Sequence, residues 1–177
     1  MLLAAEGAVL LLVDLQERLM PVIHDHEAVV ARSVRLAEAA QLLDVPIRAT
    51  EQHPAGLGAT VPPLAAYPQA TLAKTTFSAV ADAGFSALLP AGAGQVIVAG
   101  VEAHVCVMQT VLGLLGSGRR VAVAADAVGS RDPADRAAAI ERARQHGAEI
   151  VTSEMVLFEW LHDARHPKFR EVQKLLK

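Results

Sequence analysis

The fold is decided by residues 95–109, which read QVIVAGVEAHVCVMQ. The β-branched and apolar run at residues 96–98 predicts a buried strand, and Gly100 interrupts it. From Val107 onward, apolar residues recur at helical spacing. Cys106, the only cysteine, therefore lies at a strand-to-helix turn, on the first turn of the predicted helix. Backbone N–H groups and the helix dipole at such a place favour a thiolate, or bind an oxyanion of a substrate.

Composition narrows the class of protein. The chain has 177 residues, of which 53% are hydrophobic, enough for one domain with a substantial core. A net charge of −3 and a pI near 6.1 give no basic surface, which argues against a nucleic-acid partner. A single cysteine excludes an internal disulfide framework and a cysteine-based zinc site.

The N-terminal residues 1–14 are apolar but resemble neither a signal peptide nor a membrane span. They lack a basic n-region, and Glu6 and Asp14 interrupt them. The apolar run is also too short to cross a bilayer. We therefore interpret it as the first buried strand of a cytoplasmic protein with no membrane partner.

Strand and helix patterns alternate along the whole chain. Apolar runs predict strands at 8–13, 47–50, 70–73, 96–99, 120–125 and 149–152. Helical patterns occupy 25–43, 82–89, 103–115 and 132–147, with a further helical region after Ser153. Residues 51–63 contain three prolines and two glycines and are predicted to form a loop. The alternation predicts an α/β fold: a single three-layer α/β/α domain over residues 1–177 with a mostly parallel six-stranded sheet.

Three residues with complementary chemistry follow predicted strands. Asp14 ends the first strand, Lys74 ends the third, and Cys106 follows the fourth. Ligands of parallel sheets bind beyond the carboxyl ends of the strands, so all three should face one crevice. A carboxylate, an ammonium group and a thiol suit nucleophilic catalysis, with Lys74 stabilising a thiolate. The alternative is that Asp14 and Lys74 are only an ion pair at the sheet edge.

Several segments carry a family resemblance: LLLVDLQERL at 10–19, KTTFSAV at 74–80, VIVAGVEAHVCV at 96–107 and VAVAADAVGSR at 121–131. With the order of elements over nearly the whole chain, they resemble the isochorismatase-like cysteine hydrolases. Residues 50–62 and 166–176 resemble the isochorismatase domain-containing branch of that family. The resemblance implies an isochorismatase-like fold.

The same resemblance implies a mechanism. It implies a catalytic triad of Asp14, Lys74 and Cys106, and a cis peptide bond between Val101 and Glu102. The N–H groups of Glu102 and Cys106 would form an oxyanion hole. Cys106 would attack a carbonyl carbon, Asp14 would pass the thiol proton to the leaving amine, and water would hydrolyse the thioester.

The resemblance also bears on metals and on the bond cleaved. Nicotinamidases of the family bind a metal through an Asp-x-His pair and another histidine. Here the pair would be Glu51 and His53, and no further histidine occurs between His53 and His104, so we expect no metal and no cofactor. True isochorismatases can act without the cysteine, because vinyl ether hydrolysis needs only acid. Cys106 therefore favours an amide or imide-type C–N bond.

Four further residues are candidates for the substrate pocket: Gln16, Gln52, His53 and Phe77. Gln16 could orient the first aspartate or cap the first helix. Phe77 could line the pocket, although a place in the core is the more common role for such a residue. His53 lies in the Pro/Gly loop, where a solvated or hydrogen-bonding side chain is expected.

Two other polar residues are not predicted to be catalytic. His104 precedes Cys106 by two residues, so the side chains should point to different sides of the turn and His104 is not assigned as the base. Asp126 ends the fifth strand and is predicted to cap the following loop.

Two rival functions remain besides a small-molecule hydrolase. One is a catalytically idle binding or scaffold protein, and the other is a peroxide sensor, although no second cysteine can resolve a sulfenic acid. Rapid alkylation of Cys106 by iodoacetamide at neutral pH would indicate a thiolate of low pKa. The family resemblance and the apolar composition also predict a homo-oligomer, a dimer or larger.

Overall fold

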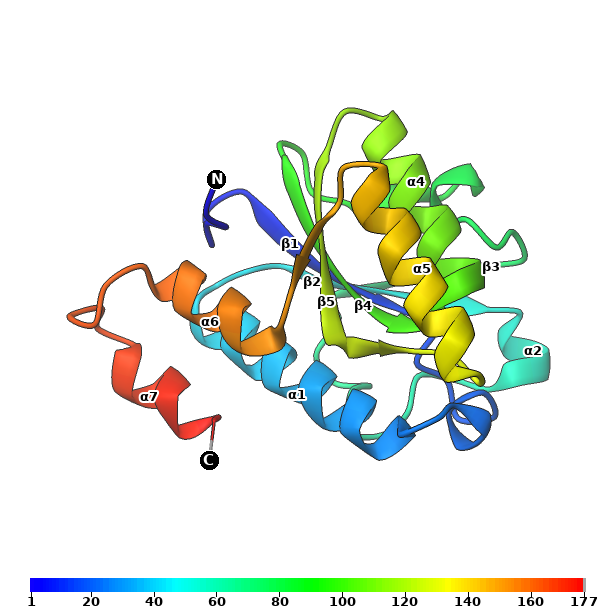
Figure 1. Cartoon of the computed structure of the whole chain (residues 1–177), viewed down its shortest axis with the longest axis horizontal. Helices are drawn as coiled ribbons and strands as arrows, with labels where there is room; N and C mark the ends of the chain where they lie inside the picture. Colours follow the sequence, from blue (N-terminus) through cyan, green and yellow to red (C-terminus); the bar gives the residue numbers. More distant parts are fainter. Residues whose placement is uncertain (177) are drawn as a thin grey trace.

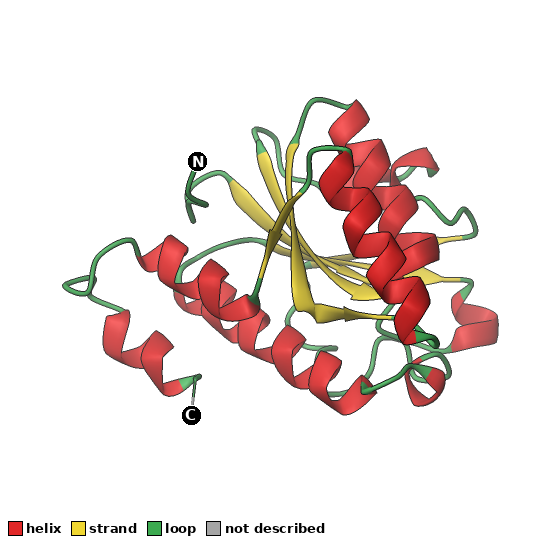
Figure 2. Ribbon diagram, viewed as in Figure 1, coloured by secondary structure: helices red, strands yellow, loops and turns green. Residues whose placement is uncertain are grey.

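The computed structural model describes residues 1–176, and its six strands form one twisted sheet (Figure 1 and Figure 2). The strands are β1 Ala8–Val13, β2 Ile47–Gln52, β3 Ala70–Lys74, β4 Gln95–Val101, β5 Arg120–Gly129 and β6 Glu149–Val151. Their spatial order is β3-β2-β1-β4-β5-β6, and each neighbouring pair is parallel. The chain reverses its direction of travel across the sheet between β3 and β4. This makes the carboxyl ends of β1 and β4 the topological switch point, where a crevice is expected.

Helices cover both faces of the sheet and complete the predicted three-layer α/β/α architecture (Figure 1). On one face lie α1, α6 and α7, and on the other lie α4 and α5. The helices are α1 His26–Leu42, α2 Pro54–Leu57, α3 Phe85–Leu88, α4 Met108–Gly116, α5 Pro133–Gln145, α6 Ser153–Leu161 and α7 Phe169–Lys174. Within residues 1–176, no helix is both long and apolar enough to cross a membrane.

The central strand β1 shows why the apolar runs are continuous. Leu10 and Leu12 pack into the core beneath α1 and α6, whereas Leu11 and Val13 pack into the core beneath α4 and α5. Successive side chains of a strand point to opposite faces, so a sheet covered on both sides needs apolar residues at every position. All six residues of β1 are buried accordingly.

Gly100 does not end β4, contrary to the prediction, because the strand continues to Val101. Its φ of +143° and its close approach to β1 both require glycine. A β-carbon at this position would lie 2.2 Å from the carbonyl oxygen of Val13. Gly100 therefore lets β1 and β4 approach closely at the switch point.

The predicted helix at 103–115 begins differently from expectation. Residues Ala103–Val107 form a π-helical turn, and the α-helical geometry of α4 starts only at Met108. The predicted helix at 82–89 is also shorter and consists of α3 alone, after a 3₁₀ turn at Ala79–Ala81. The Asp82 carboxylate accepts a hydrogen bond from the backbone N–H of Gly84, which holds this segment in a turn.

Asp126 was predicted to cap the loop after the fifth strand, and this is wrong. Strand β5 continues past Asp126 to Gly129. The Asp126 carboxylate accepts hydrogen bonds from the N–H and the Oγ of Ser153, each at 2.6 Å. Asp126 therefore anchors the start of α6. The predicted cap at Asp132 is confirmed, because its side chain accepts a bond from the Ala134 N–H at 2.8 Å.

Candidate active site

Asp14 follows β1 directly and lies at the switch point of the sheet. It is fully buried, and its φ of 55° places the backbone in the left-handed region. Its N–H donates to the carbonyl oxygen of Thr50 at 3.0 Å, and its Oδ1 accepts from Thr50 Oγ1 at 2.6 Å. The backbone and the carboxylate are thus both held by one residue of β2.

Lys74, the last residue of β3, reaches into the same region. Its Nζ donates to Asp14 Oδ2 at 2.8 Å and to Gln52 Oε1 at 2.8 Å. The side chains of Lys74 and Asp14 are both completely shielded from solvent. The predicted pairing of these two residues is therefore present as a buried ion pair.

Cys106 lies in the π-helical turn and is only 5% exposed. Burial, the charge of Asp14 and a hydrogen bond to that carboxylate raise the pKa of the Cys106 thiol to about 12, although Lys74 opposes the shift. The thiol is neutral at neutral pH. Lys74 does favour the thiolate, as expected, but burial and the charge of Asp14 have the larger effect on the thiol pKa.

Glu102 forms the turn between β4 and Cys106. Among residues 1–176 every peptide bond is trans, so the predicted cis bond between Val101 and Glu102 is absent. Instead, Glu102 turns the chain through a left-handed backbone with φ of 42° and ψ of 76°. Its carbonyl oxygen accepts bonds from the N–H groups of Val105 and Val107 at 2.9 and 3.3 Å. The predicted oxyanion hole at Glu102 and Cys106 stays a prediction.

The side chain of Glu102 belongs to a second polar cluster at the ends of β4 and β5. Its carboxylate accepts a hydrogen bond from the Arg131 guanidinium and lies 3.5 Å from His104 Nδ1. His104 Nδ1 is 3.1 Å from Ser130 Oγ, and its Nε2 is 3.5 Å from the Asp135 carboxylate. His104 therefore makes its polar contacts toward the start of α5.

Gln16 takes neither of its two predicted roles. Its side chain is fully buried and clamps the loop after β2: Nε2 donates to the carbonyl oxygens of Gln52 and Gly58, at 3.0 and 2.7 Å. Its Oε1 accepts from the Gln52 N–H at 2.7 Å. Gln52 in turn directs its own side chain to Lys74. The structure thus brings Gln52 to the ion pair and places Gln16 behind it.

The remaining pocket candidates are more exposed. Phe77 is 54% exposed, so the interpretation of it as a core residue is wrong. His53 is also exposed, and its ring packs over Gly56. Glu51, its predicted partner in a metal pair, instead accepts two bonds from Thr60 through Oε1, at 2.7 and 2.8 Å. Within residues 1–176, no three His, Cys, Asp or Glu side chains gather as metal ligands.

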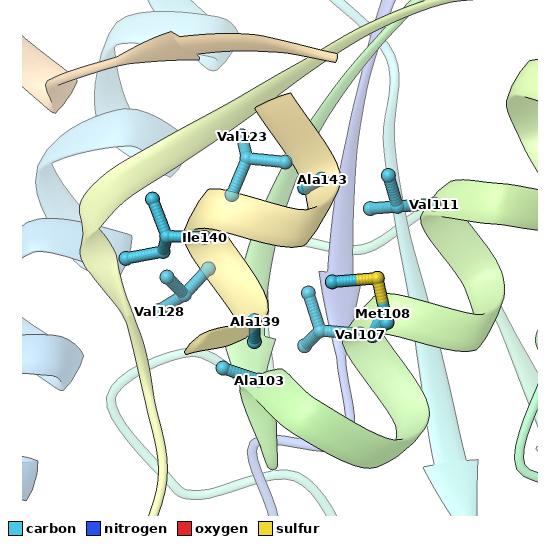
Figure 3. A pocket seen from close by; sticks show the side chains of 9 residues that line it. All are labelled: Ala103, Val107, Met108, Val111, Val123, Val128, Ala139, Ile140 and Ala143. Atoms are coloured by element: carbon cyan, nitrogen blue, oxygen red, sulfur yellow. The ribbon is translucent and has the colours of Figure 1, made fainter. Parts of the chain in front are cut away.

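A small apolar cavity of about 10 Å³ lies behind the π-helical turn (Figure 3). It is bounded by Ala103 and Val107 of the turn, by Ala139 and Ala143 of α5, and by Val123 of β5. An apolar space of this size does not hold a water molecule. The cavity is therefore part of the packing that supports the turn, and the polar groups around Cys106 lie elsewhere.

Sequence reasoning missed Thr50 and Arg131 as neighbours of the site. Thr50 sits inside a short predicted strand, where a threonine is ordinary on β-propensity alone. Thr50 is fully buried, which would have marked it as unusual, but that burial follows from the order of the strands in the sheet and not from the sequence. The contact of Arg131 with Glu102 depends on how β4 and β5 end side by side.

Comparison with known proteins identifies the family of this chain. The family model for the isochorismatase domain matches residues 8–155. The chain therefore belongs to the isochorismatase family, as the sequence motifs predicted.

Individual relatives extend the match to nearly the full chain. Isochorismatase domain-containing protein 2 of Danio rerio is 43% identical over 98% of this chain and 89% of its own length. The structure described as MAR1 ribonuclease from Caenorhabditis elegans has a TM-score of 0.93 and 38% identity, covering 99% of this chain and 92% of that one. The YcaC gene product of Escherichia coli, described as an octameric hydrolase of unknown specificity, has a TM-score of 0.85 and 26% identity, with coverage of 98% and 95%.

Proposed function

We propose that the protein is a hydrolase of a small molecule that uses Cys106 as nucleophile to cleave an amide or imide-type C–N bond. The observation that carries the proposal is the buried Asp14–Lys74 ion pair beside a neutral, buried thiol. An ion pair that served stability alone would not need a nucleophile next to its carboxylate. Membership of the isochorismatase family and the description of the Escherichia coli relative as a hydrolase support it.

The raised pKa of Cys106 assigns a role to Asp14. Because the thiol is neutral at rest, its proton must leave as the sulfur attacks the carbonyl carbon, and Asp14 is the base that accepts it. The C–N bond then breaks, and the amine leaves with that proton. Water next attacks the Cys106 thioester and gives one proton to Asp14. The carbon–sulfur bond breaks, the carboxylic acid leaves, and Asp14 returns the proton to the Cys106 sulfur. Lys74 stays hydrogen-bonded to the Asp14 carboxylate and holds it in place for these transfers.

The developing oxyanion needs donors close to Cys106. The backbone N–H groups of Glu102 and Cys106 are the proposed donors, since both belong to the turn that carries the nucleophile.

A second candidate function comes from the name of the Caenorhabditis elegans relative, a ribonuclease. The net charge of −3 gives little attraction for a polyanion, and the 5% exposure of Cys106 suits a small substrate better. The third candidate is the catalytically idle binding or scaffold protein. The third candidate predicts neither an acyl adduct nor RNA cleavage, so one experiment separates all three.

The test is intact-protein mass spectrometry after incubation with small amides, imides and ureido compounds, and with a short oligoribonucleotide in parallel. We expect an acyl adduct on the wild-type protein and none on Cys106→Ala, with the added mass identifying the acyl group. RNA cleavage that survives Cys106→Ala would favour the second candidate. Hydrolysis of a small amide by Cys106→Ala at the wild-type rate would refute the nucleophile.

Alkylation by iodoacetamide no longer separates these candidates. With the pKa of Cys106 raised to about 12, slow alkylation at neutral pH is expected for a catalytic thiol as well as for a structural one. Acyl-adduct formation is therefore the better measurement.

We also propose that the chain forms a homo-oligomer. The Escherichia coli relative is described as octameric, and Val22, Phe77 and Phe158 are large apolar side chains that are exposed on this chain. Light scattering coupled to size-exclusion chromatography tests this directly. A mass of 18.6 kDa in solution, that of one chain, would contradict it.

A further inference from the structure

We propose that Thr50 is a positioning residue that aims the Asp14 carboxylate at the Cys106 thiol. The inference rests on the proposed function, in which Asp14 takes the thiol proton. Thr50 lies in β2, next to β1, and has no exposed surface. Valine has the same shape and would suit a buried strand at least as well. The presence of threonine at this position therefore points to a specific role for its hydroxyl group.

Thr50 holds Asp14 at two points. Its carbonyl oxygen accepts the Asp14 N–H at 3.0 Å, and its hydroxyl donates to Oδ1 at 2.6 Å. The first bond fixes the backbone where the chain leaves β1 in a left-handed conformation. The second fixes the carboxylate. Main chain and side chain of one residue thus set where the base sits and how it is turned.

The two oxygens of Asp14 are held from two different strands. Thr50 of β2 donates to Oδ1, and Lys74 of β3 donates to Oδ2. Two donors on opposite oxygens hold the carboxylate in one orientation. In that orientation its charge acts on Cys106 and raises the pKa of the thiol. Lys74 supplies a charge and one hydrogen bond, and the hydroxyl of Thr50 supplies the second hydrogen bond that completes the orientation.

Removal of the hydroxyl would leave Oδ1 without its donor inside a fully buried site. A buried carboxylate in that state rotates toward another donor. Rotation lowers the fraction of molecules in which the Asp14 carboxylate is correctly oriented to accept the thiol proton. Proton transfer from Cys106 slows as a result, whereas substrate binding has no direct contact to lose.

The test uses p-nitrophenyl acetate as an acyl probe. The Cys106 sulfur bonds to the acetyl carbon, the thiol proton passes to Asp14, and p-nitrophenolate leaves. We expect Thr50→Val to lower the maximal acylation rate about tenfold or more while the probe concentration at half-maximal rate stays within about twofold. Thr50→Ser, which keeps the hydroxyl, should restore the rate. Thr110→Val is the matched control, because it removes another fully buried threonine hydroxyl, one that bonds the Ala79 N–H.

A double-mutant cycle with Asp14→Asn separates positioning from general damage. If Thr50 acts through Asp14, Thr50→Val has no further effect in the Asp14→Asn background. An equal loss in both backgrounds, a wild-type rate for Thr50→Val, or failure of Thr50→Ser to recover would overturn the inference while leaving Cys106 as nucleophile. Absence of an acetyl adduct on the wild-type protein, or an adduct of the same yield on Cys106→Ala, would overturn the proposed function and this inference together.

Discussion

Lys74 and Asp14 form an ion pair with no solvent exposure on either side chain, Nζ lying 2.8 Å from Oδ2. Removing two charges from water costs several kcal/mol for each ion, so such a pair persists only where further hydrogen bonds complete it. Here Gln52 accepts a second bond from Lys74, and Thr50 donates a second bond to Asp14. The sheet therefore builds a polar site whose members depend on one another.

Lys74→Met tests that dependence through stability. The change leaves the Asp14 charge buried and unpaired, and we expect the free energy of unfolding to fall by about 3–5 kcal/mol. Urea denaturation measures this. Lys168→Met is the matched control, because Lys168 pairs with Glu171 at the surface and its loss should cost less than about 1 kcal/mol. Equal effects of the two changes would mean that the buried pair does not behave as a pair.

Asp14→Asn should change the pKa of the Cys106 thiol and the rate of hydrolysis in ways that distinguish ionisation of the thiol from catalysis. The Asp14 charge and its hydrogen bond both raise the pKa of Cys106, so their loss lowers that pKa from about 12 toward the ordinary value of 9.0. The ultraviolet absorbance of the thiolate, measured against Cys106→Ala, follows this change. Hydrolysis should be lost although the thiol ionises more readily, because the base is gone. An unchanged thiol pKa would show that Asp14 does not act on Cys106.

The raised pKa of Cys106 also predicts how stability depends on pH. The folded protein holds the thiol proton more tightly than the unfolded chain, so this contribution is fully present below about pH 9 and is lost as pH rises toward 12. Its size is on the order of a few kcal/mol. The unfolding free energy of wild type minus that of Cys106→Ala should therefore decrease across this window. A difference that stays constant with pH would contradict the shift.

Sequence reasoning located the strands and the three central residues for a common physical reason. A strand covered on both faces needs a continuous apolar run, and a polar residue that ends such a run, as Asp14 does, must lie at the carboxyl edge. Lys74 lies at the same edge because it ends the parallel edge strand β3. The same reasoning misjudged the state of Cys106. It considered the helix start and the nearby ammonium, whereas burial and the carboxylate decide the thiol pKa. Both depend on packing distances that spacing does not contain.

The roles of residues in the loops could not be predicted from the sequence, because their contacts join segments that are distant along the chain. The sequence predicts Gln16 as an orienting group or a cap, but its side chain hydrogen-bonds the backbone of Gln52 and Gly58. Phe77 was considered a core residue from its type, yet the loop after β3 leaves it exposed. Residue type predicts burial only where the element that carries the residue is itself covered.

Gln16→Leu tests whether the loop after β2 supports the chemistry. Leucine fills the space but leaves three groups without partners: the N–H and carbonyl oxygen of Gln52, and the carbonyl oxygen of Gly58. Partial hydration of the loop will satisfy some of them, so we expect a loss of about 2–4 kcal/mol in unfolding free energy. Because Gln52 then loses its fixed place beside Lys74, hydrolysis should fall even at temperatures where the variant is fully folded. Gln16→Glu is the comparison variant: it can still accept the Gln52 N–H, but it cannot donate to the carbonyl oxygens of Gln52 and Gly58 and it buries a charge. Its stability should therefore fall at least as far as that of Gln16→Leu. Wild-type turnover by folded Gln16→Leu would mean that Lys74 holds its position without Gln52.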